Sequence, residues 1–208
     1  MDKAIASYYL HVYALFIGGD AGSYTNGFPS RLIYEVSFPD INVHQIRLIP
    51  EMNFTCHGVI TGYTAALRQR DGDQDPIIQI WREKLSQPGS YYKISPGIAI
   101  NNTLCIGGLT EISNDHEVFH CNLNQSNVVA VQPGDILGLE LPAKDNDDIM
   151  LAFARVNNGP TSYVFDTRQG LSSPVALSSR DWVTWRLPQI TLEIGSGECA
   201  RPSLIYHF

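Results

Sequence analysis

The segment PIIQIWRE, residues 76–83, decides the fold class. Its apolar residues are β-branched or aromatic, which favours a strand over a helix. Residues 71–76 (DGDQDP) before it have the composition of a loop, and residues 87–90 after it contain a Pro-Gly turn. The segment therefore predicts a buried strand, with Trp81 in the core.

Strand-like segments of this kind recur about every 8 to 12 residues, which is typical of sandwiches. Ile136–Leu141 alternates in hydropathy and follows the turn Gln132–Asp135, whose Pro-Gly pair fits a type II turn. After the first twenty residues, apolar positions never hold a helical period beyond two turns. We therefore expect an all-β, antiparallel β-sandwich of jelly-roll or immunoglobulin-like type over residues 28–194. The remaining expected strands are 31–38, 43–49, 54–67, 91–94, 128–131, 149–156, 161–165, 182–186 and 188–194.

The composition bounds the class of protein. The 208 residues are 44% hydrophobic and 17% charged, so the chain can bury one sizeable core. Its net charge of −7 repels phosphate backbones, and no run of Lys and Arg offsets this. Nucleic acid is therefore not expected as a partner.

The N-terminal segment has the order of a secretory signal peptide. Lys3 precedes the apolar stretch 4–19, and small residues predominate over 18–23. We expect residues 1–23 to be a signal peptide, although His11 and three tyrosines weaken the apolar stretch and leave a buried first element as the alternative. No other segment approaches the roughly 18 apolar residues of a membrane-spanning helix. The chain is therefore expected to be secreted or displayed outside the cell, with residues 195–208 as a C-terminal tail.

The four cysteines, Cys56, Cys105, Cys121 and Cys199, fit two disulfides in an oxidising compartment. Three connectivities are possible. Cys105 and Cys121 flank a short stretch and are easily bridged, which would leave Cys56 with Cys199. Four free thiols are the alternative if the chain stays in the cytosol.

Three sequons indicate N-glycosylation sites at Asn53, Asn101 and Asn124. Each can carry a glycan only on a surface that the secretory machinery reaches. Sequons also arise by chance in Asn-rich loops, so each is weak alone and gains weight beside the cysteines and the N-terminal segment.

Residues 116–120 satisfy the zinc-protease pattern HExxH, with His116, Glu117 and His120 as the functional side chains. The pattern works only on a helix, where residues i and i+4 share a face. The continuation alternates like a strand, and a strand would separate the two histidines by about 13 Å. We expect a polar hairpin beside a disulfide, with a zinc hydrolase as the alternative.

Two acidic loops offer oxygen ligands of the kind that calcium prefers: Asp71, Asp73 and Asp75 in one, and residues 145–148 in the other. The first loop lacks the EF-hand pattern, and for both loops solvated turns are the alternative. No other cofactor is expected, since the sequence holds no Walker loop, GxGxxG or GxSxG motif. Tyr91, Tyr92, Trp182 and Trp185 could form a stacking platform for a sugar or a protein, or could pack in the core.

Four motifs resemble a poorly characterised extracellular module of sponge surface proteins. They are FTCHGVI (54–60), QIWR (79–82), QPGDILG (132–138) and GPTSYVF (159–165). The resemblance spans roughly residues 28–194 and implies a cysteine-containing β domain that follows a signal peptide and lacks catalytic residues. Some members continue into a membrane anchor, whereas this sequence shows no such span.

We therefore expect a secreted or cell-surface recognition or structural module that is not an enzyme. Its partner would be an extracellular protein or glycan, bound through loops on a rigid scaffold. A subunit that assembles with its own copies through exposed strand edges is a further alternative.

Overall fold

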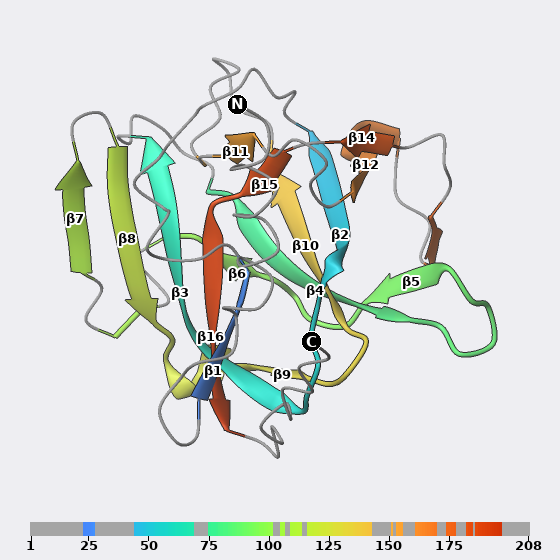
Figure 1. The fold of residues 1–208 in the computed structure, drawn as a ribbon, viewed down its shortest axis with the longest axis horizontal. Coiled ribbons are helices and arrows are strands. Elements are labelled where there is room, and N and C mark those ends of the chain that lie inside the picture. The colour runs from blue at the N-terminus through green and yellow to red at the C-terminus, as the bar shows by residue number, and fades with distance from the viewer. Residues whose placement is uncertain are drawn as a thin grey trace, which may run out of the picture.

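The computed structural model describes residues 23–27, 44–68, 75–101, 105–106, 109–113, 116–142, 151, 153–155, 161–169, 174–177, 182–184 and 186–196. Within these ranges the chain is built from β-strands and two short 3-10 turns, with no α-helix (Figure 1). Every strand pair is antiparallel. The expected all-β, antiparallel, sandwich-like fold is confirmed.

The first sheet has the strand order β1-β16-β3-β8-β7, and β9 also pairs with β3. Its long central strand β3 lies between the C-terminal strand β16 and the middle strand β8, so segments far apart in sequence meet there. The strands are β1 (Ser23–Gly27), β3 (Gly58–Arg68), β7 (Leu109–Ser113), β8 (His116–Asn122), β9 (Val129–Val131) and β16 (Ile190–Ser196).

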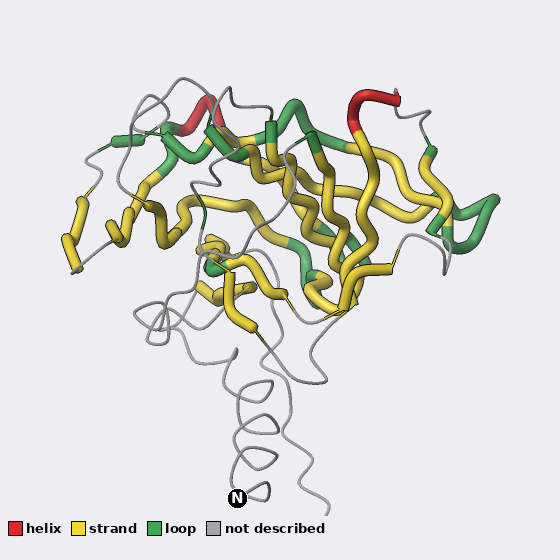
Figure 2. The backbone as a smooth tube through the Cα atoms, turned by 90° about the horizontal axis from the view of Figure 1, so that it is seen from above, coloured by secondary structure: helices red, strands yellow, loops and turns green. Residues whose placement is uncertain are grey.

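The second sheet has the order β13-β5-β4-β10-β2-β12-β14, with β6 also beside β4. Figure 2 shows this layer turned by 90°, with its strands curling at the side that carries the β4–β5 hairpin. Its strands are β2 (Gln45–Asn53), β4 (Ile77–Glu83), β5 (Ser90–Lys93), β6 (Ile98–Ala99), β10 (Ile136–Leu141), β12 (Thr161–Asp166), β13 (Val175–Ala176) and β14 (Trp182–Thr184). A separate pair is formed by β11 (Phe153–Arg155) and β15 (Arg186–Pro188), and the 3-10 turns are η3 (Gln125–Asn127) and η4 (Thr167–Gln169).

The main core lies between the two sheets. Alternate residues of each strand point into it, as the period-two geometry of a strand requires. Burying each aliphatic side chain stabilises the fold by about 1.5 to 3 kcal/mol. The core includes Ile60, Tyr63 and Ala65 from β3, Phe119 from β8, Ile190, Leu192 and Ile194 from β16, and Ile78, Ile80, Leu137, Leu139 and Leu141 from the second sheet.

A smaller apolar cluster lies on the other face of the second sheet, which we call the outer cluster. It consists of Ile46, Leu48, Trp81, Ile136 and Val175, with Tyr91, Tyr163, Phe165 and Leu177 partly buried against it. The central strands of this sheet are therefore buried on both faces, which explains the nearly continuous apolar run in β4. Trp81 is in a buried position as predicted.

Gly138 is required where Trp81 crosses β10. A Cβ atom at Gly138 would lie 2.5 Å from Cδ1 of Trp81, too close for any side chain. The indole Nε1 donates a hydrogen bond of 2.9 Å to Oε1 of Gln79, and Nε2 of Gln79 donates in turn to the carboxylate of Glu140. The buried polar groups beside Trp81 are thus paired.

Most strand boundaries agree with the sequence-based expectations. Gly134 has a φ of 87°, as the predicted turn requires. β16 extends to Ser196, so the strand continues two residues into the expected tail. The expected strand 31–38 and the expected signal peptide, apart from Ser23 of β1, lie outside the described residues. Among the residues that are described, no helix has the length and apolarity needed to cross a membrane.

Candidate functional site

The β4–β5 hairpin projects from one side of the molecule (Figure 1). Its strands pair between Trp81 and Lys93 and between Glu83 and Tyr91. The connecting residues 85–89 are all exposed to solvent. The loop of the hairpin is therefore open to solvent beyond the paired part of β4 and β5.

Hydrogen bonds hold the tip of this hairpin in one conformation. The backbone N–H of Lys84 donates to the carbonyl of Ser90 at 2.7 Å, and the N–H of Gln87 donates to the carbonyl of Lys84 at 2.8 Å. Gly89 has a φ of 78°, which glycine adopts without strain, and its N–H donates to Oε1 of Glu83 at 2.6 Å. The tip is a structured turn.

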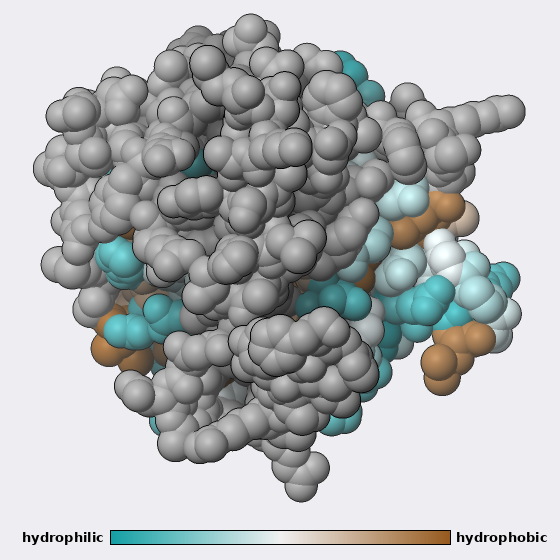
Figure 3. All heavy atoms as spheres, viewed as in Figure 1, coloured by the Kyte–Doolittle hydropathy of each residue, from teal (hydrophilic) through white to brown (hydrophobic). Residues whose placement is uncertain are grey.

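Leu85 lies at this structured tip and is 100% exposed. Among the side chains whose exposure the structure describes, two other large hydrophobic ones are exposed, Ile106 at 60% and Val128 at 37%. Figure 3 shows the apolar colour at the end of the hairpin, surrounded by polar residues. Because the Leu85 side chain stays in water, it does not stabilise the fold by burial. Its apolar surface is instead available for contact with a partner.

An ion pair anchors the base of the hairpin. Nε and Nη2 of Arg82 donate to the two carboxylate oxygens of Asp135 at 2.7 and 2.9 Å. Asp135 is fully buried and also accepts a hydrogen bond from the N–H of Gln132 at 2.9 Å. These hydrogen bonds and the negative charge of Asp135 raise the pKa of Arg82 above its ordinary value. The pair ties β4 to the turn that precedes β10, so the hairpin has a fixed base.

Tyr91 lies on the hairpin beside the outer cluster. Burial raises the pKa of its hydroxyl, and the charges of Glu83 and Tyr163 add to the shift. Tyr163 lies on β12, and three strands separate β12 from β5 in the sheet order, so the sheet must curl to bring the two side chains close. The β4–β5 hairpin is therefore continuous with the face of the second sheet that carries the outer cluster, where Tyr91, Tyr163 and Phe165 lie.

Within the predicted aromatic platform, Tyr91 and Tyr92 do not lie side by side on one face of the sheet. Tyr91 and Tyr92 are consecutive in β5, so their side chains point to opposite faces. Tyr91 packs against the outer cluster, whereas Tyr92 acts on Arg82, whose pKa it helps to raise. The side chain of Trp182 and all of Trp185 lie outside the described residues.

The HExxH segment is the strand β8, paired with β7 on one side and β3 on the other. Nδ1 of His120 lies 2.9 Å from Oγ1 of Thr64 on β3. Four residues along a strand span about 13 Å, so His116 and His120 cannot share one ion in the way that a helix allows. The zinc alternative thus lacks the helix on which it depends, and the expected hairpin is present. Among the described residues, no group of three or more His, Cys, Asp or Glu is placed to hold a metal.

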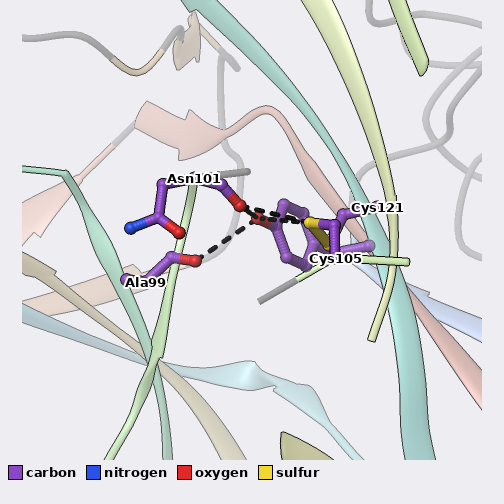
Figure 4. Close-up of a disulfide and its surroundings, with 5 residues drawn as sticks. Ala99, Asn101, Cys105 and Cys121 are labelled. Carbon is purple, nitrogen blue, oxygen red and sulfur yellow. Dashed lines mark hydrogen bonds between the residues drawn. A yellow bond between two sulfur atoms is a disulfide. The ribbon is translucent and has the colours of Figure 1, made fainter. Parts of the chain in front are cut away.

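The β7–β8 hairpin lies beside the disulfide between Cys105 and Cys121 of β8, whose Cα atoms are 5.2 Å apart. Figure 4 shows the carbonyl of Asn101 directed at this bridge, 3.1 Å from Sγ of Cys105. Cys56 is disulfide-bonded as well. Cys199 lies outside the described residues, so the pairing of Cys56 with Cys199 stays a prediction.

Of the acidic residues that could bind calcium, only Asp75 lies in a described range. Its Oδ2 accepts a hydrogen bond of 2.7 Å from Nδ2 of Asn101. Asp71 and Asp73 lie outside the described residues, as do residues 145–148. The residues that flank the two loops are neighbours, because Ile77 pairs with Glu140 and Leu67 with Leu151. Calcium binding stays a prediction.

The three sequon asparagines differ in their surroundings. Asn53 and Asn124 are exposed, whereas Asn101 is half-buried. Asn53 is the last residue of β2, whereas Asn124 lies just beyond β8 and Asn101 just beyond β6.

Leu85 and the pairing of Arg82 with Asp135 were not among the residues predicted to be functional. A leucine between the polar residues of a turn, in Lys84–Gly89, was the one available signal for the exposed tip. No signal in the sequence indicates the ion pair, because its partners are 53 residues apart.

No protein-family model, curated protein or solved structure matches this chain. The resemblance to sponge extracellular modules therefore stays a prediction.

Proposed function

We propose that this protein is a secreted or cell-surface recognition module, without catalytic activity, that binds an extracellular protein through its β4–β5 hairpin. The observation that carries the proposal is Leu85, fully exposed at the tip of a hydrogen-bonded turn. Binding residues are often found on loops that a rigid scaffold positions, and here the sandwich is that scaffold.

The apolar tip favours a protein partner over a sugar. Burying one leucine side chain in a partner's pocket would stabilise a complex by about 1.5 to 3 kcal/mol. That energy corresponds to roughly a ten- to hundredfold change in Kd. The ordered tip also keeps the entropic cost of binding low, because the turn is already formed.

An extracellular location is favoured by the disulfides. Cys105 and Cys121 are bridged and Cys56 is bonded as well, and structural disulfides are rare in the reducing cytosol. The apolar N-terminal segment fits the same proposal.

Substitution of Leu85 tests this function. The wild-type chain is screened against an array of extracellular protein domains, and each binder is then titrated against L85S and S86A. We expect binders to lose at least tenfold in affinity for L85S and to keep their affinity for S86A, an exposed neighbour on the same turn. Melting temperatures equal to that of the wild type would show that both variants remain folded. Binders that do not distinguish L85S from the wild type would refute the hairpin as the binding site.

A self-assembling subunit is a second candidate. Ile106 is 60% exposed and its N–H donates to the carbonyl of Asn122, which places it beside the β7–β8 edge of the first sheet. Sedimentation velocity over a range of concentrations tests this candidate. A concentration-dependent dimer that I106S abolishes would favour it, and a monomer at every concentration would exclude it.

A further inference from the structure

The sequon at Asn53 presents its acceptor to solvent. Asn53 is the last residue of β2 and lies between the buried Met52 and Phe54, so the alternation of the strand directs it outward. Thr55, which supplies the hydroxyl of the sequon, is exposed as well. Phe54 holds this segment in place, because its N–H donates to the carbonyl of Asp135 at 2.8 Å.

The sequon at Asn124 is also open. Asn124 and Ser126 are both exposed, just beyond the end of β8. The side-chain oxygen of Asn124 accepts a long hydrogen bond of 3.5 Å from the N–H of Ser126. This contact uses Oδ1, whereas a glycan is attached to Nδ2, so folding and modification are compatible there.

At Asn101 the atom that would carry a glycan is instead engaged within the fold. Its Nδ2, the atom that would carry a glycan, donates to Oδ2 of Asp75 at 2.7 Å. Its carbonyl accepts from the hydroxyl of the buried Tyr63 at 3.3 Å and lies against Sγ of Cys105 (Figure 4). The preceding residue, Ile100, is fully buried. Side chain and backbone of Asn101 are thus both part of the folded structure around the disulfide.

We propose that N-glycans occupy Asn53 and Asn124 but not Asn101, and that closure of the Cys105–Cys121 disulfide withdraws Asn101 from modification. The inference rests on the proposed passage through the secretory pathway. In this reaction Nδ2 forms a bond to the anomeric carbon of a lipid-diphosphate-linked oligosaccharide. The carbon–oxygen bond to the diphosphate breaks, the lipid diphosphate leaves with the electron pair, and one amide proton is lost to a base. The step involves no oxidation or reduction.

The two proposed glycans would lie at one end of the sandwich. β3 begins directly after the turn that follows Asn53, and β8 runs antiparallel to β3, so β2 and β8 finish at the same end (Figure 1). Glycans there would restrict partners at that end of the first sheet.

The test is the occupancy of each site in protein made by a eukaryotic secretory cell behind the host's own leader sequence. An amidase that removes the glycans in heavy-oxygen water converts each occupied Asn to a labelled Asp, which peptide mass spectrometry reads site by site. We expect label at Asn53 and Asn124 and none at Asn101 in the wild type. In C105S/C121S, label should appear at Asn101 while the other two sites stay occupied.

A second measurement tests the role of the disulfide in the wild-type sequence, so that it does not require C105S/C121S to fold. Dithiothreitol given briefly to cells making the wild type prevents disulfide closure, and the newly made chains should then carry label at Asn101. Variants N53Q and N124Q control for the assignment of each peptide. Full occupancy of Asn101 in the untreated wild type, no rise when the disulfide is prevented, or unmodified Asn53 or Asn124 would each overturn the proposal.

A parallel culture makes the chain with its own N-terminal segment and no host leader. If that chain stays inside the cell while the host-led protein shows the expected pattern, the proposed extracellular function fails, and the result then establishes only which of the three sequons the fold leaves accessible.

Discussion

Tyr91 links the candidate hairpin to the outer cluster, and its ionisation reports on that contact. Burial raises the pKa of its hydroxyl above the ordinary value of 10.0, with added effects from Glu83 and Tyr163. Because the folded pKa exceeds the unfolded one, this contribution to stability is complete below about pH 10 and is lost as the pH rises through the folded pKa. We expect the free energy of unfolding of Y91F to fall less steeply than that of the wild type between about pH 9 and about pH 11.

Urea unfolding at a series of pH values measures this slope. Y92F is the matched control, because Tyr92 is the next residue of the same strand and faces the other side of the sheet. An unchanged slope in Y91F would show that Tyr91 titrates alike in the folded and unfolded chains.

Single residues also show which aspects of burial and pairing the sequence predicts and which it does not. The burial of Trp81 was predictable, because it lies in an apolar strand bounded by turns. The full exposure of Leu85 was not, because hydropathy alone assigns a leucine to the core. Asp135 reads as an ordinary turn residue, and its buried pairing with Arg82 arises only when β4 and β10 align.

At the scale of elements, β8 shows that a motif needs the right secondary structure to have its chemistry. The HExxH pattern is intact in residues 116–120, yet the strand pairs with both neighbours along its length. The alternation of apolar and polar residues from Phe119 to Asn124 predicted this outcome. That residues 116–122 form a strand could be predicted from the sequence, because strand periodicity is visible within a few consecutive residues.

The Cys105–Cys121 disulfide gives this edge of the sheet a measurable contribution to stability. The two cysteines are separated by 16 positions, and closing a loop of that size constrains the unfolded chain by about 3 kcal/mol. We therefore expect C105S/C121S to lower the free energy of unfolding by about 3 kcal/mol in urea titrations. Q125A, an exposed change nearby, should stay within about 0.5 kcal/mol of the wild type. A loss below about 1 kcal/mol would mean that the unfolded chain already brings this loop together.

At the scale of the whole molecule, the pairing of strands could not be read from the sequence. Composition and turn spacing predicted the sandwich-like class, and the bounds of β10 agree with the segment expected to be a strand. Nothing local indicates that β3 pairs with β16 at the other end of the chain, or that β10 lies between β2 and β4. These contacts depend on how the apolar faces of distant strands complement one another. The sequence rules for hairpins apply only to strands that follow one another in the chain.

The shared core predicts that the two sheets unfold together. Ile80 of β4 and Leu192 of β16 belong to different sheets, yet both are fully buried in the same cluster. We expect I80A and L192A each to lower the free energy of unfolding by about 2 to 5 kcal/mol, because each leaves a cavity in a packed interior. Each variant should keep one transition, with circular dichroism and tryptophan fluorescence giving the same urea midpoint. V128A, at a side chain that is 37% exposed, is the control and should shift the midpoint little. Two separate transitions, with I80A and L192A each moving only one, would instead show that the sheets form independent folding units, and the hairpin would then depend on the second sheet alone.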